Sequence, residues 1–78
     1  MEIIEMKNLA IYGAGGFGRE VACLIQNINS KLKKWNLIGF FDDGKIVGSQ
    51  TEYGEVLGDI NTLNSWTDDL AIVIAVGN

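Results

Sequence analysis

The sequence predicts a small α/β domain built on a parallel sheet, and three observations lead to this fold class. A short apolar segment, NLAIY at residues 8–12, runs directly into a glycine-rich turn and then a helical pattern. Residues 37–41 and 70–76 are apolar on both alternating faces, as in parallel strands that helices cover on both sides. Strands that alternate with helical segments are typical of βαβ units with right-handed crossovers.

The first helix is expected over residues 16–28, directly after the glycine turn. Its buried face should carry the apolar residues that recur at helical spacing, namely Val21, Leu24, Ile25 and Ile28. Cys23 lies in the same apolar run, so we expect it to be a small core residue. Because it is the only cysteine, no internal disulfide can form.

The middle of the chain supplies two further strands and a short helix. Residues 35–41 (WNLIGFF) form the second strand, in which Gly39 indicates the close approach of another backbone or a ligand. Residues 54–58 form a short strand at a sheet edge. Asp59 is a favourable N-cap for a helix over residues 60–64.

The last strand, LAIVIAV at residues 70–76, is the clearest one because it is rich in β-branched residues and has no polar member. We expect it to be central, beside the strand at residues 8–12, with Ile74 fully buried. We expect a sheet of about four strands whose spatial order is 3-2-1-4 when the strands are numbered along the chain. Residues 45–53 are expected to form a loop. Since a helix would normally cover such a strand, residues 1–78 are expected to be one domain of a longer protein.

Composition and charge exclude several classes of function. The 78 residues allow one small domain, and an apolar fraction of 47% is ample for its core. A net charge of −4 argues against a nucleic-acid partner, which favours a basic face. The absence of histidine, with a single cysteine, leaves no expected metal site and no activated catalytic nucleophile. No signal peptide or membrane-length apolar run is present, so a cytoplasmic location is expected.

The glycine turn carries the strongest functional signal. Gly13-x-Gly15-x-x-Gly18 fits the nucleotide-binding fingerprint. Gly13 permits a tight turn, Gly15 lets a phosphate approach the backbone, and Gly18 lets the helix pack on the strand. The N-terminus of the helix offers unpaired N–H groups to an anion. Taken alone the pattern is weak, because glycine turns after strands are common.

Two further segments converge with the glycine turn at the carboxyl ends of the predicted strands. Asp42 and Asp43 follow the second strand, and Gly77 and Asn78 follow the last one. Asp42 lies 24 positions after the last fingerprint glycine, near the place of the acid that binds ribose hydroxyls. The two aspartates either contact a ribose and a base, or they open a turn in which Gly44 supplies a positive φ.

Four motifs in this order, GAGGFGRE, GFFDD, YGEVLGDINTL and AIVIAVGN, resemble the N-terminal domain of bacterial sugar O-acyltransferases. This family includes sialic-acid O-acetyltransferases and PglD-type UDP-amino-sugar N-acetyltransferases, and the resemblance covers residues 8–78. It implies a Rossmann-like domain that binds a nucleotide sugar, a UDP-sugar, in glycan biosynthesis. The substrate-binding residues that it implies are Gly13, Ala14, Gly15, Gly16, Phe17, Gly18, Asp42, Asp43, Gly77 and Asn78.

For the parent protein, the resemblance implies a second domain and an acetyltransferase activity. In the family, a left-handed β-helix binds acetyl-CoA, supplies a catalytic histidine and forms a homotrimer. This chain has neither hexapeptide repeats nor histidine, so we expect it to hold no cofactor, to be inactive alone and to be a monomer or weak dimer. The family often has histidine at Phe17, so no polar contact is assigned to that position.

Two alternatives belong to other classes. Strings like GFFDD followed by GEVLG also occur in NAD-binding domains of nucleotide-sugar dehydratases and redox-sensing repressors. In the first alternative, the chain is an NAD(H)-binding module. In the second, it is a stand-alone nucleotide sensor that catalyses no reaction. A hexapeptide-repeat segment in the parent gene would favour the acyltransferase, and a DNA-binding or dehydratase segment would contradict it.

Overall fold

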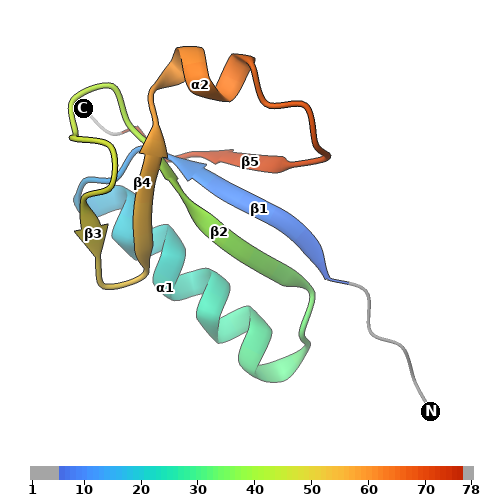
Figure 1. The fold of residues 1–78 in the computed structure, drawn as a ribbon. Helices are drawn as coiled ribbons and strands as arrows, with labels where there is room; N and C mark the ends of the chain where they lie inside the picture. The colour runs from blue at the N-terminus through green and yellow to red at the C-terminus, as the bar shows by residue number, and fades with distance from the viewer. Residues whose placement is uncertain (1–5, 77–78) are drawn as a thin grey trace.

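The computed structural model describes residues 6–76 and shows an α/β fold (Figure 1). Five strands and two helices follow one another as β1 (Lys7–Tyr12), α1 (Gly16–Lys31), β2 (Trp35–Phe41), β3 (Gln50–Thr51), β4 (Gly54–Gly58), α2 (Ile60–Asn64) and β5 (Ala71–Ile74). The predicted fold class is thereby confirmed. The helix α1 extends three residues beyond its predicted end, and its last turn carries Lys31, where a cation suits the helix dipole.

The sheet has the order β3-β4-β2-β1-β5. The strands β4, β2, β1 and β5 run parallel to one another and keep the predicted relative order. The difference is β3, which the sequence analysis assigned to a loop. It pairs antiparallel with β4 and lies beyond it, so β4 is not the edge strand that we expected. A two-residue strand in a polar segment has too little periodicity to be recognised from sequence.

The prediction that residues 70–76 form a central strand with a buried Ile74 is wrong. The strand β5 covers only Ala71–Ile74, and among the described residues it pairs with β1 alone. The residue Ile74 is 73% exposed. Apolar, β-branched composition indicates a strand, but it does not determine how many neighbours the strand has.

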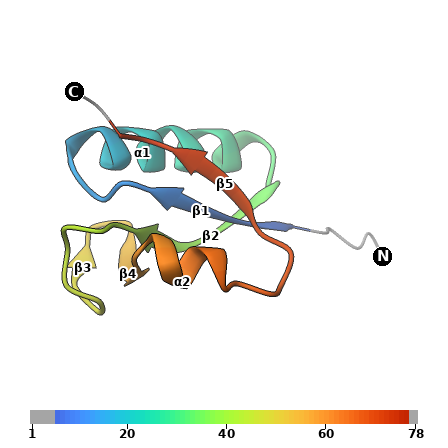
Figure 2. The ribbon, with the colours of Figure 1, turned by 90° about the horizontal axis from the view of Figure 1, so that it is seen from above.

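The main core lies between α1 and the sheet (Figure 2). The strand β1 contributes Leu9 and Ile11, whose side chains share one face because strand residues alternate. The helix α1 contributes Ala22 and Ile25, which pack against that face together with Phe40 of β2. The residues that share one face of β1 and those that share one face of α1 therefore determine how α1 packs on the sheet.

The buried face of α1 is rotated relative to the predicted one. Its buried residues are Gly18, Ala22 and Ile25, whereas Leu24 is 58% exposed and Ile28 40% exposed. Cys23 is exposed as well, so its assignment to the core is wrong. Successive helix residues differ by about 100°, and once Ala22 faces the sheet, the next two residues turn away from it.

The helix α2 covers the opposite face of the sheet (Figure 2). As predicted, Asp59 caps it, and its side chain accepts a hydrogen bond of 3.0 Å from the backbone N–H of Thr62. On the same side, the ring of Trp66 packs edge-on against that of Phe41, with 5.6 Å between the ring centroids. These contacts hold the chain after β4 close to the carboxyl end of β2.

Gly39 has the close backbone approach that the sequence predicted. Its φ is +150°, and a Cβ at this position would lie 2.7 Å from the carbonyl oxygen of Glu55 in β4. The pairing of β1 with β2 also shifts by one residue here, because Leu9 pairs with Leu37 and Ala10 pairs with Gly39. Such a shift leaves one residue of β2 without a partner in β1 and disrupts the ladder locally.

Candidate functional site

The parallel strands bring the glycine turn and the residues that follow β2 and β5 to one edge of the sheet. A cleft with a volume of about 370 Å³ opens there between the ends of β1 and β5. The strand order reverses at this point, because the chain moves from β1 outward to β2 and β4 and returns to β5 on the other side. In open α/β sheets, ligands bind at such a switch point.

Two glycines of the fingerprint have structural roles. Gly13 has a φ of +116°, and a Cβ there would lie 2.5 Å from the carbonyl oxygen of Ala75. A Cβ on Gly18 would collide with the carbonyl oxygen of Gly13. Gly13 therefore allows β1 to end against the segment after β5. Gly18 allows α1 to pack closely, as the sequence predicted, but its nearest neighbour is the turn at Gly13 and not the strand.

Gly15 and Gly16 differ from those two, because the fold itself does not require them. A Cβ at either position would meet no atom within 4 Å. Both residues line the cleft, and Gly15 is the N-cap of α1, with no side chain to accept from the first helical amides. Open space in front of unpaired N–H groups is the arrangement that an anionic ligand needs.

The carboxylate of Asp42 holds the glycine turn. One oxygen, Oδ2, accepts a hydrogen bond of 2.8 Å from the backbone N–H of Ala14, and Oδ1 accepts one of 2.8 Å from Gly44 N–H. Asp42 is half-buried and lines the cleft. Each carboxylate oxygen has a second lone pair, so Asp42 can accept from a ligand while it orders the turn.

Asp43 links three elements of the fold. Its Oδ2 accepts a hydrogen bond of 2.8 Å from the hydroxyl of Tyr12, and its Oδ1 accepts one of 2.8 Å from the backbone N–H of Ile60 at the start of α2. The bond to Asp43 raises the pKa of Tyr12 above its ordinary value. The residues that line the cleft do not include Asp43, which connects the ends of β1 and β2 to α2.

The structure therefore brings most of the predicted site residues to one edge. The predicted residues that line the cleft are Gly13, Gly15, Gly16, Phe17 and Asp42. Ala14 is buried beside them, and Gly18 is buried under the turn. Gly77 and Asn78 lie outside the described residues.

The sequence analysis missed two residues of the cleft, Ala75 and Val76, which follow β5 and line the cleft beside Gly13. Their side chains are apolar and carry no chemical signal, so only the pairing of β5 with β1 reveals them. Val76 is 61% exposed and leaves an apolar wall beside the polar turn.

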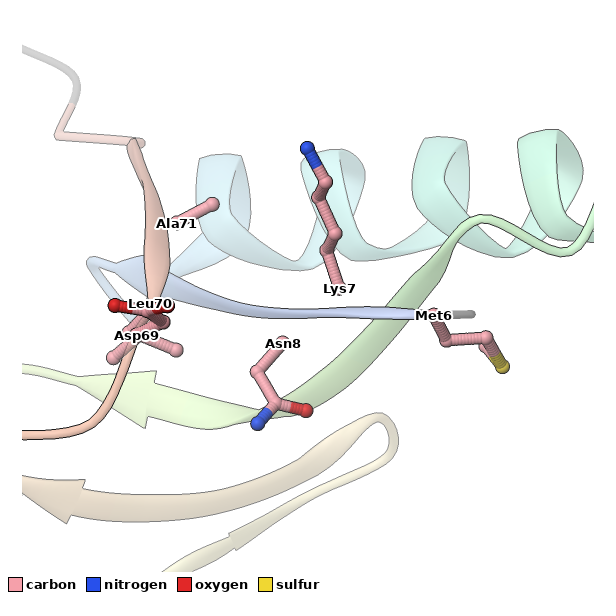
Figure 3. Close-up of a pocket in the computed structure, with 6 residues that line it drawn as sticks. All are labelled: Met6, Lys7, Asn8, Asp69, Leu70 and Ala71. Carbon is pink, nitrogen blue, oxygen red and sulfur yellow. The ribbon is translucent and has the colours of Figure 1, made fainter. Parts of the chain in front are cut away.

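A larger hollow, of about 550 Å³, lies at the opposite edge, where β1 and β5 begin. Figure 3 shows that the side chains of Lys7 and Asn8 point to opposite faces of the sheet there. Because the polar groups do not converge on one point, size alone does not make this hollow a binding site.

The described part of the chain was also considered for metal-binding groups and membrane-spanning helices, and it shows neither. Residues 6–76 contain no group of three or more histidine, cysteine or acidic side chains placed to hold a metal ion. No helix within the same residues combines the length and the apolar character needed to cross a membrane.

Comparison with known families decides the affiliation of the chain. A family model described as the PglD N-terminal domain matches residues 8–78, which is nearly the whole chain. The chain belongs to the PglD N-terminal domain family. The resemblance inferred from the four motifs is confirmed, and the glycine turn and cleft of this PglD N-terminal domain lie inside the matched region. Searches of curated proteins and of solved structures found no match.

Proposed function

We propose that this domain binds a nucleotide sugar, a UDP-sugar, in the cleft at the carboxyl edge of the sheet. One observation carries the proposal: the cleft lies at the switch point between β1 and β5, and its wall is a glycine turn that leads into the N-terminus of α1. Family membership supports the choice of a nucleotide sugar.

Each part of the cleft has a role in this proposal. The amides at the start of α1 bind the phosphate end of the ligand, which approaches over Gly15 and Gly16. Asp42 accepts hydrogen bonds from the ribose or the base with its remaining lone pairs. Val76 and Ala75 offer apolar contact in the same cleft, and ligand contacts of Gly77 and Asn78 stay a prediction of the sequence.

We further propose that the full-length protein is an acetyl-CoA-dependent sugar acetyltransferase and a homotrimer. This domain then presents the sugar, while acetyl-CoA and the catalytic base come from elsewhere in the protein. The chain contains no histidine, and Cys23 lies on the exposed side of α1. The contribution of residues 6–76 to the reaction is therefore binding and orientation of the acceptor.

Calorimetry with UDP, CMP and NAD tests the binding proposal. UDP should bind, Gly15→Val should abolish binding, and Asp42→Ala should weaken it. Because a Cβ at position 15 would meet no atom within 4 Å, Gly15→Val should leave the chain folded, and urea unfolding provides that control. Tight NAD binding without UDP binding would favour a dinucleotide module, and failure to bind all three would contradict the proposal for this chain.

A further inference from the structure

Tyr12 and Asp43 connect the ends of β1 and β2 through their side chains. The hydroxyl of Tyr12, the last residue of β1, donates a hydrogen bond of 2.8 Å to Oδ2 of Asp43. The acid directly before Asp43 in the chain, Asp42, accepts from the backbone N–H of Ala14. The end of β2 is therefore tied to the chain on either side of Gly13, once by each acid.

The bond between Tyr12 and Asp43 lies on the face of the sheet that α2 covers (Figure 2). Ile11 belongs to the core under α1, and because strand residues alternate, Tyr12 points to the other face. There Oδ1 of Asp43 accepts a hydrogen bond of 2.8 Å from the backbone N–H of Ile60, the first residue of α2. Neither Tyr12 nor Asp43 lines the cleft. Asp43 therefore anchors the end of β2 to both β1 and α2 from outside the cleft.

The direction of the Asp42 carboxylate depends on how the chain passes through Asp43. Oδ1 of Asp42 accepts a hydrogen bond of 2.8 Å from the N–H of Gly44, which follows Asp43 in the chain. A rotation of the backbone at Asp43 would move that N–H and turn the Asp42 carboxylate with it. The two hydrogen bonds of the Asp43 side chain oppose such a rotation.

The hydroxyl of Tyr12 is a suitable partner for Asp43 at neutral pH. The hydrogen bond to Asp43 raises the pKa of Tyr12 above its ordinary value, so the phenol keeps its proton and remains a donor. Because the acceptor is a carboxylate, the bond is charge-assisted, and such bonds are about twice as strong as those between neutral groups.

We propose that Tyr12 and Asp43 are positioning residues of the site, which hold residues 42–44 so that the Asp42 carboxylate faces the ligand. The inference rests on the proposed function, in which Asp42 accepts hydrogen bonds from the ribose or the base. It differs from the ligand contact that the family resemblance implied for Asp43, because both oxygens of this side chain are engaged within the fold. Of the two adjacent acids, Asp42 contacts the ligand and Asp43 orients Asp42.

Calorimetry with UDP tests this role through a double-mutant cycle. Tyr12→Phe keeps the ring and removes the hydrogen bond to Asp43, so it should weaken UDP binding about three- to tenfold. In an Asp42→Ala background, the same substitution should change the affinity by less than about twofold, since no carboxylate remains to be oriented. Tyr53→Phe is the matched control, because it removes the other tyrosine hydroxyl of the chain, between β3 and β4, and should bind UDP like the native chain.

Amide hydrogen exchange of the ligand-free chain tests the same inference without a nucleotide. Greater freedom of residues 42–44 weakens the acceptor of the Ala14 N–H, so Tyr12→Phe should speed exchange at Ala14 about three- to tenfold. Exchange at Thr62, whose N–H donates to Asp59, should stay as in the native chain. Urea unfolding shows that the variant is folded under the same conditions.

The outcomes separate this inference from the proposed function. An equal loss of UDP affinity from Tyr12→Phe in both backgrounds, or no loss in either, would overturn the positioning role. Weaker binding in Asp43→Ala with native affinity in Tyr12→Phe would also overturn it, because Asp43 would then contact the ligand directly. If no form binds UDP, the nucleotide-sugar function is contradicted, and exchange at Ala14 still decides whether Tyr12 and Asp43 hold Asp42 in place.

Discussion

The carboxylate of Asp42 accepts a hydrogen bond of 2.8 Å from the backbone N–H of Ala14, 28 positions earlier in the chain. This contact ties the end of β2 to the turn after β1. The acid that the fingerprint assigns to a ribose therefore also fixes the loop that would bind the phosphates. In the proposed complex, ligand binding and local stability would be coupled through this one side chain.

We expect Asp42→Ala to lower the free energy of unfolding as well as ligand affinity. The substitution leaves the N–H groups of Ala14 and Gly44 without their charged acceptor, at a cost of about 1–3 kcal/mol. Asp42→Asn keeps one acceptor oxygen, so its free energy of unfolding should lie between those of the native chain and of Asp42→Ala. Urea unfolding measures the effect, with the exposed Asp68→Ala as control. If Asp42→Ala were as stable as the native chain but no longer bound ligand, Asp42 would contribute to binding and not to stability.

The two large side chains Phe40 and Ile74 should respond oppositely to truncation. Phe40 is fully buried, so Phe40→Ala should cost about 3–5 kcal/mol of stability. Ile74 is 73% exposed, so Ile74→Ala should change stability by less than about 0.5 kcal/mol. The urea midpoints of the two variants check this. A large loss in Ile74→Ala would mean that β5 is covered in solution.

Alanine substitutions at Gly16 and Gly18 should separate the roles of the fingerprint glycines. Gly18→Ala places a Cβ against the carbonyl oxygen of Gly13 and should cost about 1–3 kcal/mol or more. Gly16→Ala places its Cβ in open space within α1 and should be neutral or stabilising by up to about 1 kcal/mol. Thermal unfolding of the pair tests this, and equal losses would contradict the packing of α1 on the turn.

The cap of α2 should make stability depend on pH in the acidic range. The backbone N–H of Thr62 holds the pKa of Asp59 below its ordinary value. A carboxyl whose pKa is lower in the folded state stabilises the fold above its unfolded pKa of about 3.9. That contribution disappears as the pH falls through the folded pKa.

Asp59→Asn is the matched variant for this prediction, because asparagine also caps helices but does not titrate. Urea midpoints measured between pH 7 and pH 2 should fall less steeply in Asp59→Asn than in the native chain. Identical slopes in the two proteins would show that other carboxyls determine the acid response.

Local signals determined much of the fold. The glycine turn predicted the passage from β1 to α1, and Asp59 predicted the start of α2. Both features depend on residues close together in the chain, where backbone geometry and capping act directly. The four motifs also indicated the family whose model matches residues 8–78.

Tertiary structure decided what local signals do not contain. Burial of Cys23, Leu24 and Ile74 depends on which neighbours lie across each face, and all three are exposed. The hydrogen bonds of Asp42 and Asp43 join residues 28 and 31 positions apart, so a sequence pattern shows two acids but not their partners. Similarly, Arg19 of α1 and Lys45 of the segment between β2 and β3 line one hollow, although they are 26 positions apart in the chain. Contacts between distant segments form when the sheet assembles, and the chain order alone does not specify them.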